Sequence, residues 1–284
     1  MRFKWEYPVF LGLLSAVAAT VVSCSKDSTS PGQSVAVRDE PQLAQQKLLD
    51  LQDKYGWAGK YHTDALVHIH NKLSHNSASS KSDKCRAGIV ALKEFNKSFS
   101  KDGKSKGVDD HFLANEEPCA SSFSTTLQTG TSSGLSPNGA AMLRQIGDLF
   151  DSGASSATIV SKVEAIENDA NENLSAFEAG AIVSAGSVAI SSAQYWNANL
   201  ASWRAGSSAG ASASLQLPLI GRSSISLVNP AANAPRSEES VDSGIGKVDF
   251  IAFVSTLLAG WWMGGWDIEV AAIRAVIASM MAAM

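Results

Sequence analysis

The sequence has little of what several large classes of function require. Only 18% of its 284 residues are charged, against about a quarter in an average soluble domain. Its 23 Lys and Arg do not outnumber its 27 Asp and Glu, so the chain lacks the basic excess with which proteins bind a nucleic-acid backbone. We therefore expect no nucleic-acid partner. The many Ala, Ser and Gly residues instead favour helices that pack closely through small side chains.

Common catalytic and nucleotide-binding motifs are also missing. The sequence contains no P-loop, no glycine fingerprint for a dinucleotide, no H-E-x-x-H and no C-x-x-C pair. Residues 130–134 and 206–210 match the G-x-S-x-G pattern of hydrolases, but that site needs a catalytic histidine later in the chain. The last histidine is His111, which precedes both matches. We therefore predict that the protein is not an enzyme and has no cofactor.

Four of the five histidines lie close together in the sequence, at His62, His68, His70 and His75. His68 and His75 share a helix face with Asp64, so these three residues are candidate metal ligands. A solvated polar face explains the same residues, and we predict no metal site. His62 lies on an apolar stripe instead, which is typical of a hydrogen-bonded core histidine.

Three carboxylates follow one another in a later helical segment. Glu164, Glu167 and Glu172 could serve acid–base chemistry if they faced a common cavity. The apolar stripe Ile159–Val163–Ile166 lies on the same segment. We therefore expect all three carboxylates on the opposite, solvated face of that helix.

Cysteine is scarce, with three in the chain, and the first of them is the most informative. Cys24 stands directly behind an uncharged stretch from Val9 to Val22, and Arg2 and Lys4 lie before that stretch. A basic start, a short apolar core and small residues at the cleavage point are typical of a secretory signal peptide. We therefore expect residues 1–23 to be a signal peptide.

The four residues Val21-Val22-Ser23-Cys24 resemble the lipobox of bacterial lipoproteins. In that family the cysteine is diacylated, the chain is cut before it, and the lipid holds the protein to a membrane. The resemblance implies that Cys24 is lipidated and that the chain has a membrane as a partner. Ser25-Lys26-Asp27 is similar to a surface-export signal of some Gram-negative bacteria. We expect an exported protein on the outer membrane, at its periplasmic or cell-surface side.

The other two cysteines, Cys85 and Cys119, are an even pair in a chain that we expect to be exported. Oxidation is permitted outside the cytoplasm, so we predict a disulfide between them. The alternative is two free, unrelated thiols. A bond would attach residues 102–135, which have no sustained helical period, to the helix that contains Cys85.

Apolar residues recur at helical spacing over residues 39–205, which we predict to be a helical domain. Ser136-Pro137 is typical of a helix start, and another helix is expected after Ser155 or Ser156. That helix either continues past Ser175 or restarts near it. The first three apolar stripes are Ala44–Leu48–Leu51–Tyr55, His62–Leu66–Ile69–Leu73 and Cys85–Gly88–Leu92–Phe95–Phe99.

Two polar, Ser- and Gly-rich segments flank this domain. Residues 24–38, which begin with Cys24, are predicted to be a flexible tether, and residues 206–247 a low-complexity loop. The apolar segment 248–284 follows, and we predict one long helix there that packs on the helical domain. The predicted fold class is an all-α bundle around this C-terminal helix, with long irregular loops.

The predicted C-terminal helix could also enter a membrane. Its uncharged run from Phe250 to Trp266 is slightly shorter than the about 20 residues that span a bilayer. We therefore favour burial among the other helices, and keep insertion into a bilayer as the alternative. One side of the helix carries the polar stripe Asp249–Thr256–Asp267–Arg274, which we expect to face water.

Two short segments resemble uncharacterised exported bacterial proteins. Residues 59–66, Gly-Lys-Tyr-His-Thr-Asp-Ala-Leu, are similar to their G-x-x-H-N-x-x-L stretch, with Thr63 in place of the Asn, and residues 191–196 are similar to their S-x-x-Y-W segment. Those proteins often end in an Ala/Gly-rich apolar helix, which supports the all-helical prediction and implies no activity. We expect a lipid-anchored cell-envelope protein that acts as a structural or interaction module, with an envelope or surface protein as partner. The alternative is a membrane-active, toxin- or pore-like protein that inserts its C-terminal helix.

Overall fold

The structure is a computed structural model that describes residues 40–75, 80–101, 119, 134–205, 243–262 and 268–284. The predicted signal peptide, Cys24 and the tether lie outside the described residues. Most of the two G-x-S-x-G matches, residues 130–133 and 206–210, also lies outside them.

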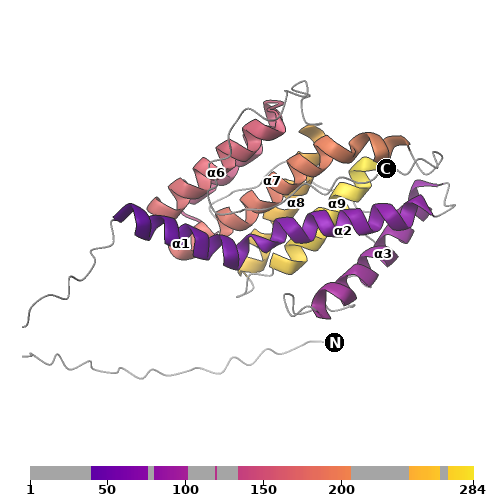
Figure 1. The fold of residues 1–284 in the computed structure, drawn as a ribbon, viewed down its shortest axis with the longest axis horizontal. Coiled ribbons are helices and arrows are strands. Elements are labelled where there is room, and N and C mark those ends of the chain that lie inside the picture. Colours follow the sequence, from indigo (N-terminus) through magenta and orange to yellow (C-terminus); the bar gives the residue numbers. More distant parts are fainter. Residues whose placement is uncertain (1–39, 76–79, 102–118, 120–133, 206–242, 263–267) are drawn as a thin grey trace, which may run out of the picture. The chain divides into compact units, whose positions relative to one another are not determined.

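Every regular element of the described residues is an α-helix, which confirms the predicted all-α bundle (Figure 1). The predicted apolar stripes point into a shared core, where Leu48, Leu66 and Leu92 are at most 9% exposed. The helices are α1 (Glu40–Tyr55), α2 (Trp57–Ser74), α3 (Lys81–Lys101), α5 (Pro137–Asp151), α6 (Ser156–Asn173), α7 (Ala176–Ala205), α8 (Ser243–Trp262) and α9 (Ile268–Ala283).

Local signals in the sequence explain where α5 and α6 begin. The Ser136 hydroxyl accepts a hydrogen bond from the backbone N–H of Gly139 at 3.1 Å, and the Ser155 hydroxyl accepts one from that of Thr158 at 3.2 Å. Each satisfies an N–H group that has no partner inside its own helix. Gly153, with φ of 66°, makes the left-handed turn between the two helices, a conformation that other residues rarely adopt.

Helix α7 starts afresh after α6. Leu174 is extended, with φ of −113° and ψ of 163°, and so ends α6. Ser175 then caps α7, because its hydroxyl accepts the N–H of Glu178 at 3.3 Å. Of the two predicted possibilities, the restart near Ser175 is therefore the one that the structure shows.

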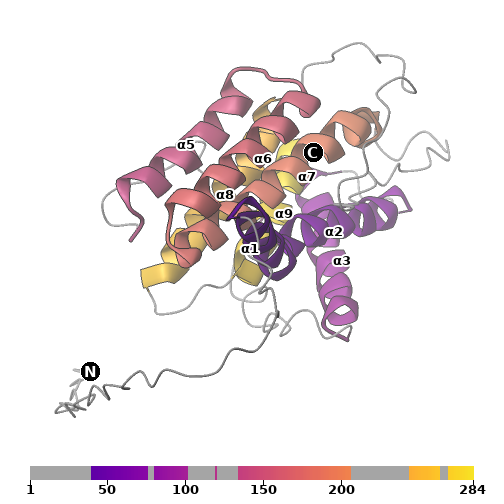
Figure 2. The same cartoon turned by 60° about the vertical axis from the view of Figure 1, so that its left-hand side comes forward.

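The long apolar helix at the centre of the bundle is α7. It contacts α1, α2, α5, α6, α8 and α9, and every residue from Ala179 to Ala193 is buried (Figures 1 and 2). Among the described residues, α7 is the one helix long and apolar enough to cross a membrane. Of its most apolar stretch of 18 residues, however, 83% is buried inside the protein. A long apolar helix that is covered by its neighbours in this way is typical of the core helix of a bundle.

Small residues allow the neighbouring helices to approach α7 closely, as the composition predicts. A Cβ atom at Gly180 would lie 2.6 Å from the ring of Tyr55, and one at Gly186 would lie 2.8 Å from Cγ1 of Val163. Both distances are shorter than any normal carbon–carbon contact, so only glycine fits at these two crossings.

The C-terminal segment differs from the single helix predicted over residues 248–284. It contains two helices, α8 and α9, which lie side by side and form a helical hairpin (Figures 1 and 2). Helix α8 also begins at Ser243, inside the predicted loop 206–247. The sequence between the two helices contains Gly264 and Gly265, which are poor helix formers. A continuous apolar pattern conceals such a break, because both arms of a buried hairpin are apolar.

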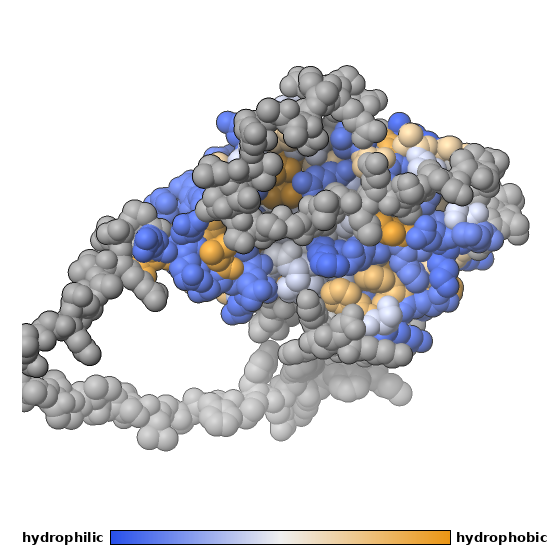
Figure 3. Space-filling view, viewed as in Figure 1, coloured by the Kyte–Doolittle hydropathy of each residue, from blue (hydrophilic) through white to orange (hydrophobic). Residues whose placement is uncertain are grey.

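The described surface is largely hydrophilic on the face drawn in Figure 3, with smaller hydrophobic areas between the hydrophilic residues. Among the described residues, the large apolar side chains that are exposed lie on α1, α3 and α7, and they are Leu43, Leu49, Val90 and Phe177. Exposed apolar residues of this number are normal for a folded domain.

Candidate functional site

A group of polar side chains is buried where α2, α7, α8 and α9 meet. The Oδ2 atom of Asp249 accepts hydrogen bonds from the hydroxyl of Ser192 and, at 2.8 Å, from Nε1–H of Trp196. Nε2 of His62 lies 3.4 Å from the same oxygen and 3.1 Å from Oγ of Ser279. All five side chains are at most 1% exposed. We call these five residues the polar core cluster.

The buried position of Asp249 corrects the prediction that its polar stripe faces water. Thr256 and Arg274 of that stripe are half-buried, and Asp267 lies outside the described residues. A helical wheel gives the direction of a side chain but not what surrounds it. Helices α2 and α7 bring donors to the carboxylate, and a carboxylate can be buried when such partners replace water.

Helix α2 reaches the cluster because Gly59, one turn before His62, lets it touch α7. A Cβ atom at Gly59 would lie 2.2 Å from the backbone oxygen of Ser187. The N–H group of Gly59 lies in the first turn of α2 and donates to the hydroxyl of Ser187 at 3.1 Å. The Ser187 hydroxyl of α7 thus gives a partner to an N–H group that has none inside α2. The burial of His62 and its hydrogen bond with Ser279 confirm the expectation that His62 is a hydrogen-bonded core histidine.

The two segments that resemble exported bacterial proteins meet at this cluster. Residues 59–66 supply Gly59 and His62, and residues 191–196 supply Ser192 and Trp196. Tyr195 of the second segment accepts a hydrogen bond from Nε1–H of Trp203 at 2.8 Å, and burial raises the pKa of its phenol. The roles that the structure gives to these residues are packing and hydrogen bonding, both between helices and within α7.

The cluster contains serine, histidine and aspartate, but it does not form a catalytic triad. In a triad the serine and the carboxylate bind opposite nitrogens of the imidazole. Here Ser279 and Asp249 both approach Nε2 of His62, and Nδ1 of His62 has no hydrogen-bond partner among the described residues. Because the side chains are fully buried, a substrate cannot reach them in this conformation.

A second buried polar contact joins α2 to α3. The Tyr61 hydroxyl donates to Oδ1 of Asn96 within a group of aromatic rings, where the Phe95 and Phe99 centroids lie 5.3 and 4.9 Å from that of Tyr61. Burial raises the pKa of Tyr61 well above its usual range, and the negative charge of Glu269 raises it further, while the bond to Asn96 lowers it. Tyr61 therefore stays protonated near neutral pH.

The structure does not bring together the candidate metal ligands Asp64, His68 and His75. Asp64 forms an ion pair with Lys60, and Nε2 of His68 lies 3.9 Å from Oε2 of Glu94. His75 bonds a backbone oxygen of its own helix at 2.7 Å. In the described part of the chain, no three His, Cys, Asp or Glu side chains are placed to hold a metal ion.

His70, like His68 and His75, makes contacts within the fold, in this case with the end of α7. Its ring lies 5.0 Å from that of Trp203, and its Nε2 is 3.2 Å from the Ser202 hydroxyl. Burial lowers the pKa of His70, which the bond with Ser202 partly offsets. The imidazole therefore joins the end of α2 to the end of α7.

The prediction of a solvated face for three carboxylates is wrong at Glu167. Glu164 and Glu172 are exposed, but Glu167 is fully buried and accepts a hydrogen bond from Nε2–H of Gln52 at 2.9 Å. Glu167 lies four residues after Val163, so the two share the helix face that contacts the core. It connects α6 to α1.

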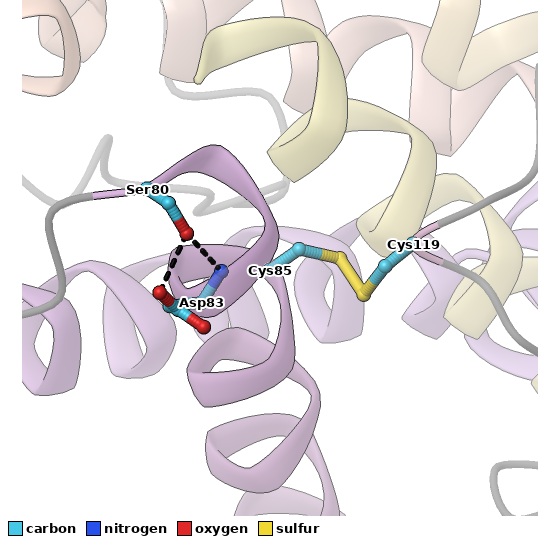
Figure 4. Close-up of a disulfide and its surroundings, with 4 residues drawn as sticks. All are labelled: Ser80, Asp83, Cys85 and Cys119. Atoms are coloured by element: carbon cyan, nitrogen blue, oxygen red, sulfur yellow. Dashed lines mark hydrogen bonds between the residues drawn. A yellow bond between two sulfur atoms is a disulfide. The ribbon is translucent and has the colours of Figure 1, made fainter.

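The structure contains the predicted disulfide between Cys85 and Cys119, whose Cα atoms are 5.9 Å apart. Figure 4 shows the bond leaving the first turns of α3, next to the helix cap made by Ser80 and Asp83. The Ser80 hydroxyl accepts the N–H of Asp83 at 3.0 Å and donates to its carboxylate at 2.6 Å. The disulfide thus joins the buried Cys85, one turn inside the capped end of α3, to a residue 34 positions later.

One carboxylate links the starts of α5 and α7. Oε1 of Glu178 accepts the backbone N–H of Ser136 at 2.6 Å, and Oε2 accepts the hydroxyl of Ser175 at 3.0 Å. Burial acts to raise the pKa of Glu178, but the hydrogen bonds from Ser136 and Ser175 outweigh it and lower the pKa below its ordinary value. The charged form of Glu178 therefore stabilises the fold.

Glu178→Gln is expected to destabilise the protein at neutral pH but not in acid. Because the folded-state pKa of Glu178 is lowered, its contribution is fully present above about pH 5 and is lost as pH falls through the folded-state value. Urea unfolding at several pH values from 3 to 7 should show the two proteins converging as pH falls. The exposed Glu172→Gln is the control, and an equal difference at pH 3 and pH 7 would contradict the prediction.

Comparison with known proteins adds no family to these observations. No family model matches the chain, and no curated protein or solved structure matches it. The functional conclusion therefore depends on the residues of this chain alone.

Proposed function

We propose that the chain is a lipid-anchored protein of the bacterial cell envelope, tethered through Cys24. The observation that carries the proposal is the sequence Val21-Val22-Ser23-Cys24 behind an apolar, uncharged segment. The disulfide between Cys85 and Cys119 supports it, since disulfides persist in oxidising compartments outside the cytoplasm.

The helical domain would act as a structural or interaction module and not as an enzyme. The polar core cluster has the residue types of a catalytic site, but its side chains are sealed in the core and both partners of His62 approach one nitrogen. Its hydrogen bonds connect four helices. An envelope or surface protein would then contact the outer faces of these helices.

Lipidation predicts a specific modified terminus. The protein purified from bacterial membranes should begin at Cys24 and carry a diacylglyceryl group, with or without a further acyl chain. Intact mass and fragment spectra of the mature N-terminus measure this directly. Cys24→Ala should abolish both the cleavage before residue 24 and the added mass, whereas an unmodified terminus at another residue would disprove the anchor.

A membrane-active protein is a second candidate, favoured by the apolar hairpin α8–α9. The uncharged run from Phe250 to Trp266 covers the end of α8, and nearly all of α9 is apolar as well. In the folded bundle these helices are covered by others, so insertion would require the bundle to open.

Fractionation of an unlipidated protein separates the two candidates. Residues 1–24 would be replaced by the cleavable signal of a non-lipidated exported protein, so that the chain from Ser25 reaches the same compartment. An anchored module should then appear in the soluble fraction. Retention on membranes after a carbonate wash would favour the membrane-active candidate.

A further inference from the structure

The outward side of α8 differs little in polarity from its buried sides, because the exposed residues in its described part are the small Gly244, Ser255 and Ala259. The five consecutive residues from Phe250 to Val254 are all at most 8% exposed. Because successive residues turn by about 100°, these five surround the whole circumference of the helix. In α9 the six residues from Ala275 to Met280 are likewise all buried. Rotation or sliding of such helices would exchange one apolar surface for another.

Within the buried part of α8, Asp249 is the one charged residue, because Lys247 is half-buried and pairs with Asp151. Its Oδ2 atom accepts hydrogen bonds from Ser192 and Trp196 of α7, and Nε2 of His62 of α2 lies 3.4 Å from the same oxygen. A rotation of α8 by one residue, or a shift by one turn of about 5.4 Å, would take the carboxylate away from all three. A buried carboxylate without donors is strongly unfavourable.

The same cluster also orients α9 and α2. His62 contacts Ser279 of α9 at 3.1 Å while it approaches Asp249 of α8, so both arms of the hairpin meet one imidazole. The position of that imidazole is itself set by the close contact of Gly59 with α7. Two separate helices, α2 and α7, thus direct polar atoms at the hairpin from defined positions.

We propose that the polar core cluster determines the single rotation and register in which the α8–α9 hairpin packs against α7 and α2. Apolar burial supplies stability but leaves several arrangements of similar energy. The hydrogen bonds to Asp249 and Ser279 are satisfied in one arrangement only. Buried polar groups have this role in some helical assemblies, where a single one specifies the register.

The test replaces the cluster by apolar residues of similar size and measures hydrogen exchange helix by helix. The unlipidated chain from Ser25 carries His62→Leu, Ser192→Ala, Trp196→Phe, Asp249→Leu and Ser279→Ala together. We expect unchanged helical content and an equal or higher thermal midpoint, with amide exchange in α8 and α9 about 10-fold faster or more. Exchange in α5 and α6 should stay within about 3-fold of the parent protein.

Thr256→Val is the matched control, since it removes a half-buried hydroxyl from α8 outside the cluster. Its exchange should equal that of the parent protein. Wild-type exchange in the apolar variant would overturn the proposal, because apolar packing alone would then position the hairpin. Loss of helical content would overturn it too, because the cluster would then be needed for folding itself.

Asp249→Asn provides a second and milder variant. Asparagine keeps the size of the side chain and one acceptor oxygen for Ser192 and Trp196. The protein should be less stable overall, but exchange in α8 and α9 should remain in proportion to that in α7. Selective loosening of α8 and α9 in this variant would count against the proposal, since the polar geometry is largely retained.

Discussion

Replacing Gly59 by leucine is expected to destabilise the bundle by about 3 kcal/mol or more, and to prevent folding if the remaining stability is smaller. The added Cβ would lie 2.2 Å from the backbone oxygen of Ser187 and 2.4 Å from Oγ of Ser191. A backbone atom cannot rotate away, so α2 and α7 would have to separate. That movement would break the hydrogen bond from the Gly59 N–H to Ser187 and displace His62 from the polar core cluster.

Urea unfolding followed by far-UV circular dichroism measures this effect. Gly147→Ala is the matched control, because a Cβ atom there would meet the ring of Phe250 at 3.5 Å, an ordinary contact. Alanine is the better helix former by up to about 1 kcal/mol, so this control should be neutral or stabilising. A free energy of unfolding for Gly59→Leu within about 1 kcal/mol of the parent would contradict the close helix contact.

Removal of the disulfide by Cys85→Ala with Cys119→Ala is expected to cost about 3–4 kcal/mol in the chain-entropy model. The bond closes a separation of 34 residues, and it restricts the unfolded chain more than the folded one. Cys85 is also fully buried, so alanine there leaves a small space beside α9, where Met280 packs on Gly88.

The effect is measured as the difference between unfolding with and without a reducing agent. The parent protein should lose stability on reduction, whereas the double alanine variant should not respond to the reductant. Each single alanine variant should resemble the double variant, because either one breaks the bond. A loss below about 1 kcal/mol would indicate that the bond contributes little to the folded state.

The helices were predictable wherever the signal is local. Ser136-Pro137 and Ser155 predict the starts of α5 and α6, because an N-cap depends on a residue and the N–H groups two or three positions later. The stripe that contains Leu66 and the stripe that contains Leu92 predict α2 and α3 for a similar reason, since the helical period is short.

Two carboxylates, for which the predicted exposure to water was wrong, show the limit of prediction from local patterns. Both Glu167 and Asp249 were expected to face water, yet both are fully buried. Glu167 was recognisable, because it lies one turn after the core residue Val163 and so shares its face. Asp249 carried a weaker signal, a single acid at the start of an uncharged run, while His62 stood on an apolar stripe. Two isolated polar residues in apolar surroundings can be expected to pair.

The hairpin of α8 and α9 had no such signal. A segment that is apolar on all sides has the same pattern whether it continues as one helix or turns back after Trp262. Which of the two forms is stable depends on the neighbours that cover it, chiefly α7 and α5 for the first arm and α2 for the second.

The sequence by itself therefore determined what depends on few residues: the all-α class, the helix caps at Ser136 and Ser155, and the pairing of Cys85 with Cys119. The lipid anchor at Cys24 stays a prediction of the same local kind. Only the tertiary structure decided that Asp249 is buried and what binds it. Its donors Trp196 and Ser192 lie 53 and 57 residues earlier in the chain. A local pattern carries no information about partners so distant, because packing alone brings them within hydrogen-bond range.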